Sequence, residues 1–390
     1  MNSERRCGIK IVFLTKERMY DNMKTYRSLW NNFIDEENVF ESIQAALRGK
    51  SKNLYVDVVK NDIGWYAEHI CDYANDFHSQ KHPHKQISDG KNGKIRQLAI
   101  PSFDETVIHH MWINAAHELF SKGMYKHTYS SIPGRGLHDA VKYIRRKIKD
   151  DPRHCKYFLK LDIRKFFNSV DVEIVKDKLA KYISDKKFLK IGFDILDSEA
   201  DQGLPLGFYT SHWIANWLLQ PLDHYIKEDL GVIYYVRYMD DMIIMGSNKD
   251  KLHQVRTRIE NYLNEELGLE LKKNWQLRRF EHNSSEGIKG HPIDFVGFVF
   301  QRDGKVKLRH KLFHRFLKKA KKVIKNQKFT VHDAQQLISY FGWSEWADMH
   351  KTYLHYVAKE IPMKRMKEYV SQYFKKQQNI NYNYLLKEEY

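Results

Sequence analysis

The stretch Tyr234-Tyr235-Val236-Arg237-Tyr238-Met239-Asp240-Asp241-Met242-Ile243-Ile244-Met245-Gly246 decides the fold. Apolar runs of strand length flank the adjacent aspartates, which predicts a β-hairpin with Asp240 and Asp241 at its turn. Neighbouring carboxylates repel each other unless a cation or solvent compensates them. A hard divalent cation prefers such oxygen ligands and keeps further positions for water or phosphate. The simpler alternative is an ordinary surface turn, and the rest of the chain decides between the two interpretations.

A further carboxylate, Asp162, ends an apolar run that begins at Tyr157 and predicts a buried strand. A charge at the end of a buried strand is unfavourable unless it is paired or functional. Asp162 is therefore the natural third oxygen donor beside Asp240 and Asp241. Ser169 or Asp171 is a suitable N-cap for the helix that we expect next.

A loop rich in helix-breaking residues lies between these acidic segments, from Gly203 to Ser211. It precedes an apolar helix, which Pro221 should bend or interrupt. A well-capped core helix is one interpretation of this pattern. The other is that the glycines let a nucleotide or a nucleic-acid backbone pack against the main chain.

Two upstream segments carry cations next to turn signals. After Asn92-Gly93, alternating residues predict a half-buried strand with Lys94 and Arg96 on the same side. Residues 129–136 predict a turn with Arg135 at its tip, where glycines would admit a phosphate. Each cation is explained by ordinary surface solvation or, alternatively, by a triphosphate clamp.

The composition favours a polyanionic partner. The 390 residues carry a formal net charge of +17 and the sequence pI is about 9.4, so nucleic acid is the first candidate. No apolar run approaches the roughly 20 residues that span a bilayer. The start of the chain lacks a secretory signal, and the 3 cysteines are far apart. We therefore expect a cytoplasmic protein without membrane partners or a disulfide scaffold.

The carboxy-terminal part predicts a strand over residues 293–300 and helices over 252–267, 305–328 and 334–357, the last interrupted near Gly342. Residues 305–328 are the most basic stretch. A solvated helix face and a helix that follows a nucleic-acid backbone explain it equally well. The lysines proposed for nucleic-acid binding are Lys318, Lys319, Lys322 and Lys325.

The stretch His82-Pro83-His84 lacks partners at zinc-ligand spacing and is interpreted as part of a loop.

In this order, the motifs resemble those of bacterial reverse transcriptases, which are RNA-directed DNA polymerases. The resemblance covers residues 40–360. The matching segments are Tyr238–Asp241 (the YxDD motif C), Leu161–Phe167 (motif A), Gly203–Ser211 (motif B), Lys94–Pro101 and Ser131–Gly136 (finger motifs), Leu269–Lys273 (motif D) and Asp294–Phe300 (motif E). It implies an α+β right-hand polymerase. The expected parts are an amino-terminal extension and fingers (1–150), a palm that also carries part of the fingers (151–304), a helical thumb (305–376) and a tail (377–390).

The resemblance also implies two-metal nucleotidyl transfer. The metals would be Mg²⁺, or alternatively Mn²⁺, and their ligands would be Asp162, Asp240, Asp241 and the carbonyl of Ile163. The implied nucleotide contacts are Lys94, Arg96, Arg135, Phe167, Leu206, Gly207, Lys272 and Lys273. Phe167 matches the bulky residue that excludes a 2′-hydroxyl, which favours dNTPs over rNTPs and disfavours RNA synthesis.

Motif B narrows the resemblance within the family. Leu206 stands where glutamine is common, which resembles diversity-generating retroelement enzymes and some defence-associated ones. His212 departs from the retroelement pattern, where glutamine follows the serine. We therefore favour a defence-associated or unclassified enzyme that copies a dedicated, structured non-coding RNA, with an accessory protein or a second copy as partner. The alternatives are mutagenic reverse transcription and a non-polymerising RNA-binding or splicing chaperone, which would gain little from the three aspartates.

Overall fold

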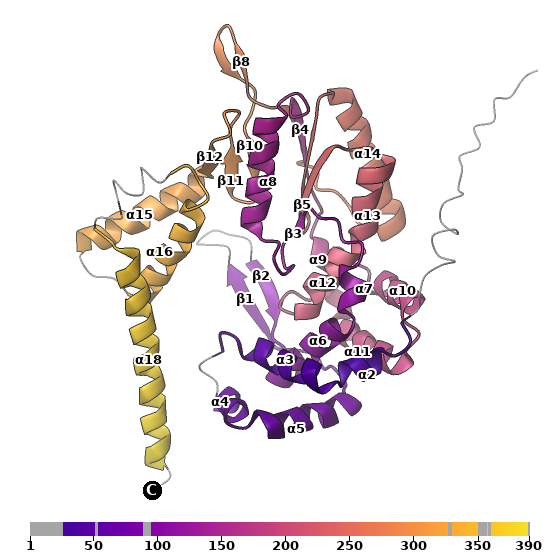
Figure 1. The fold of residues 1–390 in the computed structure, drawn as a ribbon, viewed down its shortest axis with the longest axis vertical. Helices are drawn as coiled ribbons and strands as arrows, with labels where there is room; N and C mark the ends of the chain where they lie inside the picture. Colours follow the sequence, from indigo (N-terminus) through magenta and orange to yellow (C-terminus); the bar gives the residue numbers. More distant parts are fainter. Residues whose placement is uncertain are drawn as a thin grey trace, which may run out of the picture.

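The computed structural model describes residues 26–50, 54–88, 95–326, 330–349, 357 and 360–388, with side chains as far as residue 376. Helices from the amino-terminal part lie at one end of the molecule, a β-sheet with covering helices forms the centre, and the last helices lie beside it (Figure 1). This mixture of helices and largely antiparallel sheet confirms the predicted α+β class.

The central sheet has 5 strands. In spatial order the strands are β3 (Thr128–Tyr129), β5 (Tyr234–Tyr238), β6 (Asp241–Gly246), β4 (Tyr157–Asp162) and β7 (Gln276–Arg279). The hairpin predicted around the two aspartates is confirmed, because β5 and β6 pair antiparallel on either side of Met239 and Asp240. Strand β4 pairs with the other edge of β6, and within this sheet only β3 runs parallel to its neighbour, β5.

Alternating side chains of this sheet enter different cores, as expected for a strand buried on both faces. Leu161 and Met242 belong to a large core shared with the amino-terminal helices and with α14 (Lys249–Leu267). Phe158 and Ile243 point to the opposite face, where α8 (Leu137–Asp150) packs. Period-2 alternation places Asp162 and Asp241 on this second face.

A small antiparallel sheet also packs on the second face. It consists of β10 (Ile293–Phe295), β11 (Phe298–Phe300) and β12 (Val306–Leu308). The single strand predicted over residues 293–300 is therefore wrong. Val296 and Gly297 have φ of 44° and 89°, and this pair turns the chain back on itself as a two-residue hairpin loop.

The amino-terminal part is helical and supports one exposed hairpin. That hairpin pairs β1 (His84–Ser88) with β2 (Ile95–Ala99), and Lys94 lies outside the described residues. Side-chain caps such as Asp35 and Ser102 explain where two of the helices begin. The helices are α2 (Leu29–Phe33), α3 (Glu36–Leu47), α4 (Leu54–Asn61), α5 (Ile63–Asn75), α6 (Phe103–Ala115) and α7 (His117–Ser121).

The segment between β4 and β5 covers the large core with helices. Asp171 caps α10, as the sequence predicts. Helix α12 ends just before Pro221, and α13 begins at the residue preceding that proline, so the predicted interruption is confirmed. The elements are α9 (Phe166–Ser169), α10 (Val172–Tyr182), α11 (Lys186–Asp197), the 3₁₀ turn η1 (Ala200–Gln202), α12 (Tyr209–Leu218), α13 (Gln220–His224) and the π-helical turn η2 (Tyr225–Asp229).

The carboxy-terminal helices form their own small core around Phe316, Leu337 and Val357. The predicted interruption near Gly342 is confirmed, because α16 ends at Ser344 and turns follow at residues 345–348. Helix α18 runs across the expected boundary at residue 376 and extends away from the other helices (Figure 1). The elements are the hairpin β8 (His282–Ser284) with β9 (Gly287–Lys289), then α15 (His310–Asn326), α16 (Val331–Ser344) and α18 (Met363–Glu388). None of the described helices is long and apolar enough to cross a membrane.

Candidate active site

The three predicted aspartates meet at one end of the central sheet. Asp162, the last residue of β4, is the register partner of Asp241, the first residue of β6. Asp240 lies in the hairpin turn beside them, and its carbonyl accepts the amide N–H of Ile163 at 3.3 Å. The β4–β6 ladder therefore fixes all three carboxylates next to one another, although they are about 80 residues apart in the chain.

Burial and mutual repulsion disfavour the charged forms of Asp240 and Asp241. Partial burial, together with the charge of Asp162, raises the pKa of Asp240 to about 6. Burial also raises the pKa of Asp241 to about 7, with Lys160 opposing the shift and the two neighbouring aspartates adding to it. In the described structure the buried Oδ1 of Asp241 has no hydrogen-bond partner. The site therefore has anionic oxygen atoms in excess of the groups that neutralise them.

Lys272 makes the closest cationic contact in the site. Its Nζ forms an ion pair with Oδ1 of Asp162 at 2.5 Å. The backbone holds the lysine there, because the N–H of Lys272 donates to the carbonyl of Asp162 at 2.8 Å. Lys273 is exposed on the next position. Of the two predicted lysines, the structure thus brings Lys272 to the aspartates.

The donor set fits a hard divalent cation. Three carboxylates on rigid elements, two of them with a buried oxygen that accepts no hydrogen bond, are the ligand type that Mg²⁺ or Mn²⁺ prefers. In the described residues no group of three His, Cys, Asp or Glu side chains already stands at the spacing of a metal site. The Lys272 ammonium group occupies the position beside Asp162 that a metal cation would otherwise take, and it neutralises that carboxylate.

The predicted glycine loop ties the β1–β2 hairpin to the site. The N–H of Ala99, the last residue of β2, donates to the carbonyl of Leu206 at 2.8 Å. Gly207 has φ of 114°, and a Cβ atom there would lie 2.2 Å from the carbonyl oxygen of Ala99. Only glycine permits this approach of the two backbones. The exposed Arg96 is carried on the strand that the loop holds in place.

Phe167 lies beside the same loop. Its carbonyl accepts the N–H of Leu204 at 2.8 Å, and its half-buried ring meets the ring of His212 edge-on at 5.4 Å. The ring thus packs against the start of α12.

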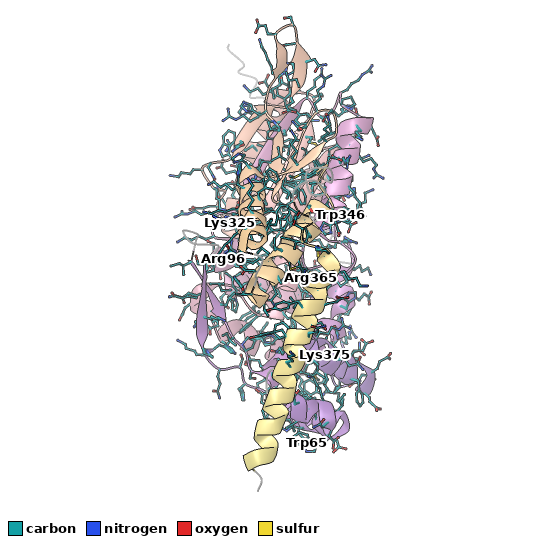
Figure 2. The ribbon with its side chains drawn as sticks, turned by 90° about the vertical axis from the view of Figure 1, so that its left-hand side faces the viewer. Trp65, Arg96, Lys325, Trp346, Arg365 and Lys375 are labelled. Atoms are coloured by element: carbon teal, nitrogen blue, oxygen red, sulfur yellow. The ribbon has the colours of Figure 1, made fainter. Side chains whose placement is uncertain are left out.

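The other predicted contacts are more widely distributed. Nη1 of Arg135 donates to the carbonyl of Tyr125 at 3.1 Å, so part of its hydrogen-bonding capacity is used within the chain. On α15, Lys319 is partly buried and lies 2.6 Å from Asp333, whereas Lys318, Lys322 and Lys325 are exposed. Lys325 and Arg96 lie on the same side of the molecule when it is viewed from the carboxy-terminal helices (Figure 2).

Two buried polar clusters were missed by the sequence interpretation. His82, assigned to a loop, is buried, with its ring nitrogens 2.5 Å from Glu105 and 3.3 Å from Glu199. Arg237 is fully buried behind the hairpin and pairs with Asp223. A signal for the second cluster was present, because an arginine in the apolar strand Tyr234–Tyr238 needs a buried acceptor.

Comparison with known proteins agrees with this geometry. Residues 81–300 match the family model described as reverse transcriptase (RNA-dependent DNA polymerase). Among curated proteins, the chain is similar to "Retron Ec73 reverse transcriptase" of Escherichia coli, with 25% identity over 224 residues. It is also similar to "Nuclear intron maturase 1, mitochondrial" of Arabidopsis thaliana, with 26% identity over 103 residues. The alignments cover 54% and 26% of this chain, and only 66% and 14% of those relatives.

Among solved structures, the chain is similar to a telomerase from Candida albicans in complex with a fragment of telomeric RNA, with a TM-score of 0.47 and 12% identity. That similarity covers 77% of this chain and 56% of the other. An apo telomerase from Candida tropicalis gives a TM-score of 0.44 at 13% identity, covering 73% of this chain and 60% of the other.

Proposed function

Because the chain belongs to the reverse transcriptase family, we propose that it is an RNA-directed DNA polymerase that copies an RNA template into DNA. The observation that carries the proposal is the meeting of Asp162, Asp240 and Asp241 at one end of the central sheet, with Lys272 against Asp162. A protein that only binds RNA gains nothing from three crowded carboxylates, since they repel the phosphate backbone.

The aspartates would act as metal ligands. Two bound divalent ions, Mg²⁺ or alternatively Mn²⁺, would supply the positive charge that nucleotidyl transfer needs at the attacking and leaving oxygens. Asp162, Asp240 and Asp241, together with the carbonyl of Ile163, would hold these ions. Lys272 would then be released from Asp162 and become available to donate a proton to the departing pyrophosphate. Lys273, the exposed neighbour, is the alternative donor.

The incoming nucleotide would lie between the β1–β2 hairpin and the glycine loop. Arg96, with Lys94 beside it in the sequence, would neutralise the triphosphate, and the tie between Ala99 and Leu206 would hold that hairpin over the site. Arg135 would contribute from the loop after β3. Phe167 would exclude a 2′-hydroxyl, and Leu206 with Gly207 would line the nucleotide position.

In the larger frame, we propose fingers over residues up to 150, a palm over 151–304 and a helical thumb over 305–376. Duplex nucleic acid would contact the exposed lysines of α15. We further propose that the template is a structured non-coding RNA and that the enzyme serves bacterial anti-phage defence. The net charge of +17 supports an RNA partner, and the resemblance of motif B supports this class. Diversity-generating reverse transcription remains the competing biological role.

The decisive experiment is primer extension. Purified protein is given an RNA template with an annealed DNA primer, dNTPs and Mg²⁺, and is compared with the Asp240→Ala/Asp241→Ala double variant. Extension by the wild type alone supports the polymerase. The Glu281→Ala/Glu286→Ala double variant removes two acidic side chains near the exposed hairpin β8–β9, and it serves as the matched control that keeps activity.

The same preparation tests the template and the biological role. RNA and DNA that copurify from cells are sequenced and compared between the wild type and the aspartate variant. One dominant RNA with a faithful DNA copy supports the dedicated-template proposal, and a copy with dispersed errors supports the diversity-generating role. Bound RNA without DNA, together with failure to extend any primer on that RNA, would leave only the non-polymerising role.

A further inference from the structure

A completely buried ion pair lies directly behind the turn that carries Asp240. Arg237 on β5 and Asp223 on α13 are both fully excluded from solvent. Nε and Nη2 of Arg237 donate to the two carboxylate oxygens of Asp223 at 2.7 and 2.6 Å. A buried pair of this kind often adds no stability relative to well-packed apolar side chains. Stability alone is therefore a weak reason for its presence.

The guanidinium is satisfied at every position. An arginine has five N–H donors, and Asp223 accepts two of them. Nη1 donates to Oδ1 of Asn216 and to the carbonyl of Met239, both at 3.1 Å, while Nη2 also donates to the carbonyl of Asn216 at 3.3 Å. A lysine has three donors and no planar fork, so it cannot make this set of contacts.

The acceptors are themselves held from several elements. Asp223 also accepts the hydroxyl of Tyr235 at 2.7 Å and that of Thr128 at 3.1 Å. The amide group of Asn216 donates to the carbonyl of Ser130 at 3.1 Å. Arg237 is thus fixed relative to β3, α12 and α13 at once, and α12 is the helix that follows the glycine loop.

The contact with Met239 is the one that reaches the site. Met239 has φ of 56°, a left-handed conformation that is unfavourable for a residue other than glycine. Such a conformation persists where the surroundings over-determine it. The Met239 carbonyl belongs to the peptide group that joins Met239 to Asp240, so its direction sets where the Asp240 side chain begins.

We infer that Arg237 is a positioning residue, which holds the Met239–Asp240 peptide group in place and thereby orients Asp240 and Asp241 toward Asp162. Through Asn216, the same side chain couples helix α12 to the hairpin turn. The inference rests on the proposed function only where it assigns metal binding to the aspartates. The orientation of the turn is a property of the folded chain by itself.

The test uses a variant that leaves no charge buried. Arg237→Met alone would strand the Asp223 carboxylate, so Arg237→Met is combined with Asp223→Leu. Arg237→Lys, which keeps the charge but loses two donors, is the second variant. Arg256→Met is the matched control, because Arg256 is a half-buried arginine on α14 that pairs with Glu260. Melting temperature and circular dichroism establish that each protein is folded.

Two readouts need no catalysis. Hydrogen exchange of the segment 234–246 in metal-free protein should be at least about tenfold faster in both Arg237 variants. Mn²⁺ affinity, measured from the electron-spin resonance of free Mn²⁺, should fall about 10- to 100-fold, the usual cost of losing a group that orients metal ligands. In primer extension the Mg²⁺ requirement should rise while the Kd for the RNA–DNA duplex is unchanged. The Arg256→Met control should match the wild type in all of these.

The outcomes separate the two proposals. A folded double variant with wild-type exchange and wild-type Mn²⁺ affinity overturns the positioning role, whatever its activity. If the double variant does not fold, the same comparison is made with Arg237→Lys. A wild-type protein that extends no primer counts against the polymerase, yet the exchange comparison still decides whether Arg237 holds the turn.

Discussion

At the scale of single residues, the raised pKa values of Asp240 and Asp241 make stability depend on pH. Their folded values, about 6 and 7, exceed the ordinary 3.8. Between pH 4 and 7 the folded protein therefore holds protons that the unfolded chain has released. The contribution of Asp240 and Asp241 to the free energy of unfolding is therefore greatest below pH 4, and it is lost as the pH rises through 6 to 7. A bound divalent cation should restore it at higher pH.

The prediction compares the wild type with Asp240→Asn/Asp241→Asn in metal-free buffer. From pH 5 to 8 the Tm of the wild type should fall relative to that of the variant by several degrees, since one pKa unit corresponds to about 1.4 kcal/mol. Adding Mg²⁺ at pH 8 should raise the Tm of the wild type only. Thermal melts at four pH values check this, and parallel curves for the two proteins would contradict it.

Phe167 gives a second prediction at this scale. Replacing it with alanine opens the space between motif A and the loop at Leu204, so a 2′-hydroxyl should be tolerated. Discrimination against rNTPs should fall about 10- to 100-fold, the range for one contact in a substrate pocket. Competing dNTP and rNTP incorporation measures this. Phe166→Leu, in the buried neighbouring ring, is the control, and unchanged discrimination in Phe167→Ala would place the gate elsewhere.

The residues that could be predicted best from the sequence were those marked by a local sequence pattern. Asp240 and Asp241 lie in the predicted turn, and Asp162 ends the predicted strand. His82 shows where pattern fails. Its partners, Glu105 and Glu199, come from α6 and from the segment after α11, so no local sequence pattern could predict them. The partners of Arg237 were hidden for the same reason.

At the scale of elements, the contact between β2 and the glycine loop holds the exposed hairpin against the site. Gly207→Ala would push a Cβ atom into the Ala99 carbonyl and would also occupy a conformation that L-residues avoid. Overpacking of this kind costs about 1–3 kcal/mol. Because the hairpin carries Arg96, we expect the KM for dNTPs to rise about tenfold or more with little change in affinity for the RNA–DNA duplex.

The control for this variant is Gly231→Ala. Gly231 has φ of 58° but open space around its Cβ position, so it reports the backbone strain without the collision. Steady-state extension kinetics and thermal melts of both variants make the comparison. Equal KM values for dNTPs in the two alanine variants would mean that the loop does not position the hairpin.

Element boundaries show what sequence can and cannot predict. Caps and breakers marked the starts at Asp171 and around Pro221 correctly. The chain reversal at Val296-Gly297 was missed, because it lies inside an apolar run that predicts one continuous strand. Only one of the two turn residues is glycine, so the turn signal was weak. The break predicted near Gly342 is confirmed, although α16 continues through that glycine and ends at Ser344.

At the scale of the whole molecule, the α+β right-hand polymerase fold predicted from the order of the motifs is confirmed by the family match and the central sheet. The resemblance implied an antiparallel sheet that carries the three aspartates, and β4, β5 and β6 form that part of the sheet. The placement of α15, α16 and α18 could not be predicted, because an amphipathic pattern indicates which face of a helix is buried but not the element that packs against that face.

The last prediction concerns that helical part. Lys318, Lys322 and Lys325 are exposed on α15, while Lys319 is held by Asp333, so the first three should contact the duplex and Lys319 should stabilise the fold. Changing the three to glutamine should weaken binding of an RNA–DNA duplex and reduce the slope of log K against log salt by roughly two to three units. Lys319→Gln should instead lower the Tm, because the Asp333 carboxylate loses its cationic partner.

A matched triple variant keeps this test specific, because removing any three lysines from a chain of charge +17 lowers its general attraction to polyanions. Lys186 and Lys190 on α11 and Lys251 on α14 are exposed, and these helices lie on the opposite side of the molecule from α15 (Figure 1). Their change to glutamine should alter the salt slope by less than one unit. Fluorescence anisotropy at several salt concentrations measures both triples, and equal slopes would mean that α15 contributes only long-range charge.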